Sequence, residues 1–206
     1  MNQYILDTEF AVQSLFELVT EELNKIASLE VQLISHRDRA NSILSEAYYV
    51  TDQDVDDLET PGMYAIRHGY PRHVSAAQAV QKEISNLEAS YYAKDSSIRT
   101  LYGSILQIAK QGISIVHGKK MPIVIIETKS SETFHNIIRQ GRNQSMHYEE
   151  GNYHPRLISC FNNLERAFGS DFDLNTGDNK AKFVVIDVLE WRNYSDYLST
   201  MKRLLP

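Results

Sequence analysis

Residues 71–92 have the sequence PRHVSAAQAVQKEISNLEASYY, in which apolar side chains recur at intervals of three or four. These side chains are Val74, Ala77, Val80, Ile84, Leu87 and Tyr91. Intervals of three and four place them on one face of an α-helix, with the polar residues on the other. The stretch therefore predicts an amphipathic helix that buries one face against a neighbouring element.

The same periodicity continues towards the N-terminus. It predicts one helix over residues 3–27 and a second from Leu33 to Ala47. Between these helices and the stretch at 71–92, residues 51–62 contain several acids, a proline and a glycine, which predict a loop. The N-terminal part of the chain is thus expected to consist of two helices followed by a loop.

Further helices are predicted towards the C-terminus. Residues 95–97, Asp-Ser-Ser, are expected to cap a helix that carries Leu101, Ile105 and Ile108. Residues 131–139 form another predicted helix, with Ser130 as its cap. A last one runs from Pro155 to Gly169, because proline suits the first turn of a helix and glycine its end.

Two short runs, MPIVIIET (121–128) and KFVVIDV (182–188), are rich in β-branched residues. Each is consistent with a short strand or with a buried helical segment, since periodicity does not separate the two in runs this short. With 206 residues, of which 42% are hydrophobic, the chain can bury a core as one domain. The prediction is therefore a single domain over residues 1–206, mainly α, an elaborated antiparallel helical bundle with one or two short strands at most.

Charge and apolar patterning restrict the class of protein. The net charge of −6 argues against a domain that binds nucleic acid through its overall charge. It is compatible with an enzyme that acts on RNA, because an acidic protein can carry a local positive cleft. The first ten residues, MNQYILDTEF, lack the pattern of a signal peptide, and the apolar runs are too short to span a bilayer. A cytoplasmic protein without membrane contact is expected. The single cysteine, Cys160, is predicted to be a buried, unreactive thiol.

No cofactor or metal site is predicted. The acids from Asp52 to Asp57 begin like a calcium loop, but position six is Asp57 instead of glycine and position twelve is Met63. The segment DFDLNTGD (171–178) also displaces the glycine. The seven histidines show no zinc-ligand spacing, and no phosphate-binding loop, dinucleotide motif or serine-hydrolase motif occurs.

Residues 137–155, IIRQGRNQSMHYEEGNYHP, gather polar and basic side chains between two apolar segments. Within them, Arg142 and His147 form the pattern R-x4-H, and Asn143 follows the arginine. This pattern resembles the motif of the HEPN superfamily, whose catalytic members are metal-independent ribonucleases with helical bundles. A looser match, from Arg67 to His73, lies in RHGYPRH, which its glycine and proline predict to be a turn.

The residue types suit RNA cleavage without a metal. Histidine titrates in the range needed to take a proton from a 2′-hydroxyl and give one to the leaving 5′-oxygen. Arginine stays charged and binds phosphate oxygens through its forked donors. We therefore expect catalytic roles for Arg142, His147 and Asn143, which orients the histidine or binds substrate, and substrate binding by Arg139 and Gln144.

The spacing of the pair indicates a dimer. On a regular helix, residues five positions apart differ by about 140° around the axis and about 7.5 Å along it, so one copy does not close them around one phosphate. A two-fold axis would bring two arginines and two histidines to one groove. The HEPN resemblance implies the same homodimer, and a setting such as a toxin with an antitoxin or inhibitor protein, or phage defence.

One feature departs from the family. Some HEPN toxins carry a regulatory tyrosine two residues after the histidine, whereas here Tyr148 follows His147 directly and Glu149 takes that position. Glu149 and Glu150 are expected to pair with Arg139 or Arg142. Two other functions remain open: a catalytically silent HEPN-like module that binds a protein or nucleotide, and a regulatory helical domain in which Arg142 and His147 only serve a helix end.

Overall fold

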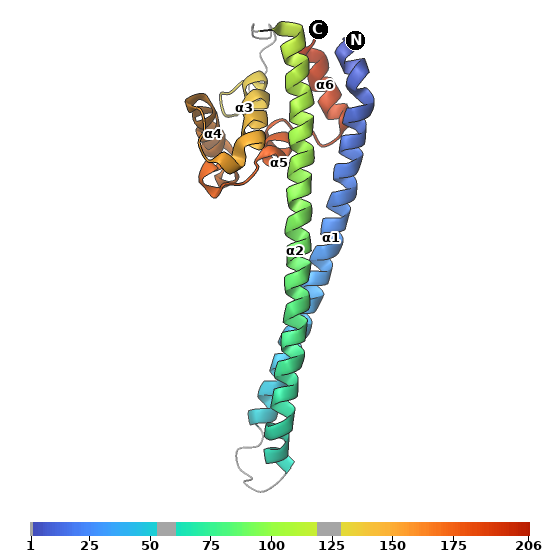
Figure 1. Cartoon of the computed structure of the whole chain (residues 1–206), viewed down its shortest axis with the longest axis vertical. Coiled ribbons are helices and arrows are strands. Elements are labelled where there is room, and N and C mark those ends of the chain that lie inside the picture. Colours follow the sequence, from blue (N-terminus) through green and yellow to red (C-terminus); the bar gives the residue numbers. More distant parts are fainter. Residues whose placement is uncertain (1, 53–60, 119–128) are drawn as a thin grey trace. The chain divides into compact units, whose positions relative to one another are not determined.

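The structure is a computed structural model that describes residues 2–52, 61–118 and 129–206, with side chains except those of 47–52 and 61–71. Its α-helices are α1 (Gln3–Asp52), α2 (Pro61–His117), α3 (Phe134–His147), α4 (Pro155–Phe168), α5 (Ala181–Phe183) and α6 (Tyr194–Leu204). Single turns of 3-10 helix are η1 (Tyr148–Glu150), η2 (Ser170–Phe172) and η3 (Leu174–Thr176), and η4 (Val184–Val188) is a π-helical turn. The described residues contain no strand, which confirms the mainly α prediction (Figure 1).

The chain forms two compact units. Unit 1 contains the N-terminal residues as far as Leu23 together with Ser96–Pro206, and unit 2 contains Asn24–Asp95. Both α1 and α2 contribute one part to each unit. The sequence analysis predicts one domain, meaning one unit that folds independently. This stays a prediction beside the division into two compact units.

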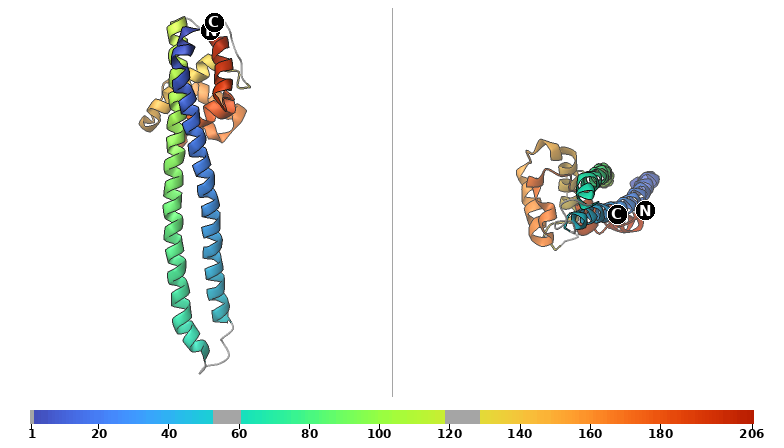
Figure 2. Two further views of the ribbon diagram at one scale, coloured as in Figure 1. Left: turned by 90° about the vertical axis from the view of Figure 1, so that its right-hand side faces the viewer. Right: turned by 90° about the horizontal axis from the view of Figure 1, so that it is seen from below.

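Unit 2 is an antiparallel hairpin made by the C-terminal part of α1 and the N-terminal part of α2 (Figure 2). Its described core consists of Leu33, Ala40, Val80 and Ile84, flanked by Ile43 and Leu87. Arg37 pairs with Glu88 at 2.8 Å, and His36 lies 3.3 Å from Glu83, so polar contacts also join the two helices beside this core. The amphipathic helix predicted at 71–92 thus buries its apolar face as expected.

Unit 1 is arranged around the C-terminal part of α2. Helices α1 and α6 lie together beside it, and α3 and α4 lie on another side (Figure 1). Tyr4 of α1 donates to the carbonyl of Ile108 at 2.8 Å, and His117 Nε2 lies 2.6 Å from the carbonyl oxygen of Leu204. Trp191 is fully buried with its ring 5.0 Å from that of Tyr197, so aromatic packing joins α6 to the rest of the unit.

Three breaks predicted within the long helices are wrong. Helix α1 continues between the two stretches predicted separately, and α2 continues through residues 95–97 and through RHGYPRH (67–73). At 95–97 the reason is visible, because the buried residues Ile98, Tyr102 and Ile105 keep the spacing of three and four begun at Ile84. Burial of one continuous face therefore outweighs the local preference of Asp and Ser for a helix end.

The strand alternative for residues 182–188 is also wrong, since they form α5 and η4. Val184, Val185 and Val188 are buried, and a helical turn brings all three to the same side. Gly141 of α3 makes this packing possible, because a Cβ added there would lie 2.9 Å from Cγ1 of Val184. Tertiary packing decides the conformation of this β-branched run. The run at 121–128 lies outside the described residues.

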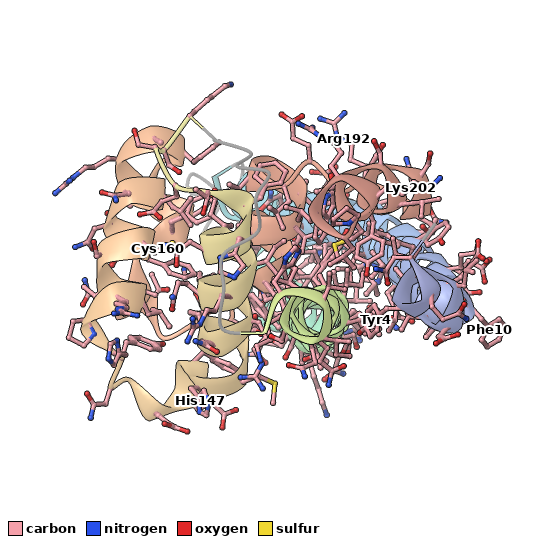
Figure 3. All side chains as sticks on the ribbon, turned by 90° about the horizontal axis from the view of Figure 1, so that it is seen from above. Tyr4, Phe10, His147, Cys160, Arg192 and Lys202 are labelled. Atoms are coloured by element: carbon pink, nitrogen blue, oxygen red, sulfur yellow. The ribbon has the colours of Figure 1, made fainter. Side chains whose placement is uncertain are left out.

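Helices α3 and α4 frame the candidate site. Helix α3 begins later than predicted, with Thr133 instead of Ser130 as its cap, and extends past Arg139 as far as His147. Helix α4 has the predicted limits, with Pro155 in its first turn and Gly169 after its last residue. Cys160 is buried on α4 (Figure 3), and burial raises the pKa of its thiol to about 12, which agrees with an unreactive cysteine.

Candidate active site

All five predicted site residues lie on α3, and the packing of this helix determines which are accessible. Its buried face contains Ile137, Ile138, Gln140, Gly141, Gln144 and Ser145. Thr133 caps the first turn by accepting a hydrogen bond from the amide of Asn136 at 3.3 Å. Arg139 and His147 are exposed, while Arg142 and Asn143 are half-buried. The buried face of α3 thus includes polar side chains, and its exposed face carries basic ones.

Arg142 is held in place by two side chains. Its Nε donates a hydrogen bond to Oε1 of Gln107 on α2, and its Nη1 donates to Oδ1 of Asn143 at 3.2 Å. Within the described part of the chain, Nη2 has no acceptor. The guanidinium is therefore oriented by two neutral partners, and these hydrogen bonds leave one terminal nitrogen unused.

His147 is the last residue of α3, and half of its side chain, 51%, is exposed. Its Nδ1 lies 2.7 Å from Oε1 of Glu150 in η1. Because a carboxylate only accepts hydrogen bonds, this contact assigns the hydrogen to Nδ1 and leaves Nε2 free to exchange protons. Figure 3 shows His147 at the outer edge of unit 1, where a ligand can approach it.

The predicted pairing of the two glutamates with arginines is wrong. Glu150 contacts His147, and Glu149 accepts a hydrogen bond from the hydroxyl of Tyr148 at 2.9 Å. That hydrogen bond raises the pKa of the Tyr148 phenol, with smaller contributions from burial and from the charge of Glu149. The two carboxylates therefore contact neighbouring side chains of the same turn, and neither of them pairs with Arg139 or Arg142.

Gln144, predicted to bind substrate, is fully buried. Its Nε2 donates to the carbonyl of Asp178 at 2.7 Å, and its Oε1 accepts from the amide of Lys180 at 2.8 Å. These hydrogen bonds join α3 to the segment that precedes α5. Gln144 is thus a packing residue in this structure and is inaccessible to a substrate.

Arg139 and Asn143 line a cleft of about 510 Å³ between α3 and α4. The other described residues that line it are Gln140, His154, Arg156 and Leu157. The sequence predictions did not include His154 or Arg156. Arg156 was recognisable as unusual, because it follows Pro155 in the first turn of a predicted helix, where the helix dipole disfavours a cation. We refer to this cleft as the basic cleft.

The second match to the motif lies elsewhere in the fold. Residues 67–73 belong to α2 within unit 2, and Arg142 and His147 belong to unit 1. His73 is half-buried, and the side chain of Arg67 lies outside those described. The described side chains therefore include the histidine of this match but not its arginine.

The described residues contain no group of three or more His, Cys, Asp or Glu side chains that could hold a metal ion. Over the same residues, no helix is both long and apolar enough to cross a membrane. Comparisons of the chain with known protein families, with curated proteins and with solved structures gave no significant match. The candidate function therefore rests on the residues of α3 and their surroundings.

Proposed function

We propose that this protein is a metal-independent endoribonuclease of the HEPN type that acts as a homodimer. The observation that carries the proposal is the pairing of Nδ1 of the half-exposed His147 with Glu150, which leaves Nε2 outside that contact, on the helix that also carries Arg142. An exposed imidazole with a fixed tautomer suits proton transfer. A guanidinium whose Nη2 has no acceptor among the residues that the structure describes suits binding of a phosphate.

In the proposed reaction, one His147 takes the proton of a ribose 2′-hydroxyl, whose oxygen then attacks the adjacent phosphorus. The bond from phosphorus to the 5′-oxygen breaks, and the second His147, from the other copy, protonates that oxygen. The products are a 2′,3′-cyclic phosphate and a 5′-hydroxyl. Arg142 stabilises the additional negative charge that the phosphoryl oxygens carry in the transition state.

The dimer supplies what one copy lacks. Arg142 and His147 are five positions apart on α3, which separates their directions by about 140° on a regular helix. Two copies related by a two-fold axis would bring the histidine of each towards the arginine of the other.

A second candidate is a binding module without catalysis. It is favoured by the two hydrogen bonds of Arg142 to Gln107 and Asn143, which also fit a purely structural arginine between α2 and α3. This candidate predicts that no RNA is cleaved at any protein concentration, by the wild type or by a His147 variant.

The test is incubation of purified protein with mixed RNA in the presence of EDTA. We expect cleavage to persist and to leave 2′,3′-cyclic phosphate ends, because no step uses a metal. His147→Ala should reduce the rate at least about a hundredfold, whereas the control variant His73→Ala should cleave like the wild type. Activity that requires added Mg²⁺, or that is lost with His73 and kept without His147, would refute the proposal.

A further inference from the structure

The basic cleft between α3 and α4 is positively charged in a protein whose net charge is −6. Arg139 and Arg156 line it from the two helices, both are exposed, and no acidic residue is among its described lining. Neither arginine forms an ion pair with another described residue. Two unpaired arginines facing one cleft repel each other, and an anion between them would remove that repulsion.

The first turn of α4 adds to the positive charge. This turn contains no acidic residue, and Arg156 stands there, at the positive end of the helix dipole. The amide of Arg156 is already bonded to Nδ1 of His154 at 3.2 Å. The side chains of the cleft, and not the free amides of the helix end, are therefore the groups that would hold an anion.

Asn143 connects the basic cleft with Arg142, the candidate catalytic arginine. Asn143 lines the cleft, and its Oδ1 accepts the hydrogen bond from Nη1 of Arg142. This leaves the amide nitrogen of Asn143 to donate towards the cleft. Arg139 lies one helical turn before Asn143, so a series of donors extends along α3 from the cleft to Arg142.

We propose that the basic cleft binds a backbone phosphate of single-stranded RNA, adjacent to the phosphate that Arg142 contacts. This inference rests on the proposed ribonuclease function and names the path of its substrate. The cleft volume of about 510 Å³ accommodates a nucleotide-sized group. Arginines contribute bidentate contacts to phosphate oxygens, and both cleft arginines are exposed.

The test measures binding separately from cleavage. A labelled 2′-O-methyl oligoribonucleotide, which has no 2′-hydroxyl to attack, is titrated with protein at several salt concentrations. The double variant Arg139→Gln/Arg156→Gln should bind at least about tenfold more weakly than the wild type. A plot of the logarithm of its binding constant against the logarithm of the salt concentration should be less steep by about 1.4, because two phosphate contacts to a single strand are lost. The matched control is Arg166→Gln/Arg192→Gln, which removes the same charge at exposed positions outside the cleft.

Three outcomes would overturn the inference: no binding by the wild type, equal losses in both double variants, or displacement of the oligonucleotide by equimolar inorganic phosphate or uridine monophosphate. The last result would identify a site for free phosphate. In cleavage assays the cleft variant should raise KM and leave kcat unchanged, because the contact is the same in the ground and transition states. If the wild type binds RNA through the cleft and cleaves none, the ribonuclease proposal fails and the binding site stands.

Discussion

Nδ1 of His147 lies 2.7 Å from a carboxylate oxygen of Glu150, three residues further along the chain, where α3 passes into η1. Both side chains are more than half exposed, so the pair contributes little to stability. Its effect is to orient the imidazole. The proposed catalytic role of His147 can be tested through this contact.

Replacing Glu150 should lower the rate of RNA cleavage without unfolding the protein. Glu150→Gln keeps the shape but removes the negative charge beside the imidazole, which weakens its hydrogen bond from Nδ1, so kcat should fall about tenfold. KM should not rise, since a negative charge near the substrate is removed. The double variant Glu150→Gln/His147→Ala should be no slower than His147→Ala alone, as expected for residues that act as a unit.

Glu149→Gln is the matched control for that experiment, because Glu149 contacts Tyr148 and not His147. It should leave kcat within about twofold of the wild type. Equal losses in the Glu149 and Glu150 variants would show that the overall charge of the turn matters and that the pair with His147 does not.

Gln144→Leu should destabilise the protein without affecting the chemistry of the site. The leucine would leave the buried amide of Lys180 and the carbonyl of Asp178 without partners, at a cost of about 2–4 kcal/mol. Urea unfolding measures this loss, and Gln111→Leu, at an exposed position on α2, is the control. If Gln144→Leu is as stable as the wild type but loses RNA affinity, Gln144 is a substrate contact after all.

The shared groove of the proposed homodimer can be tested by mixing wild type with His147→Ala under conditions that allow subunit exchange. With a ninefold excess of variant, activity per wild-type protomer should fall to about a tenth, because almost every wild-type subunit then has an inactive partner. Sedimentation measures the dimer content in parallel. A constant activity per wild-type protomer would show that each copy works alone.

His135 of α3 should make stability depend on pH. Burial, followed by the charges of Arg139 and His117, lowers the pKa of His135 below 6.5, and its Nδ1 has no partner among the described residues. The unfolded chain therefore takes up a proton as pH falls through 6.5, while the folded protein does not, so the free energy of unfolding decreases below that pH.

The measurement for His135 is urea unfolding at pH 7.5 and pH 5.5 for the wild type and His135→Leu. The variant should lose less stability than the wild type between the two values, because it has no imidazole to protonate in the unfolded state. An equal loss in both proteins would show that other groups cause the pH dependence.

The sequence by itself determined the features that depend on local chemistry. The α class follows from a spacing of three and four that is maintained along much of the chain, and the limits of α4 follow from the fixed φ of Pro155 and the conformational freedom of Gly169, which has φ 105°. The burial of Cys160 follows from its place on an apolar helical face. Each of these signals acts within one or two helical turns and needs no distant partner.

Only the tertiary structure decided the features that depend on distant partners. Residues 182–188 are helical because Val184 packs against Gly141, and Gln144 is buried because it bonds to the backbone of Asp178 and Lys180. The basic cleft exists because α3 and α4 place Arg139 and Arg156 on facing sides of one space. These residues are far apart in sequence or belong to separate elements, so no local pattern records their contacts, and the packing of a shared core brings them together.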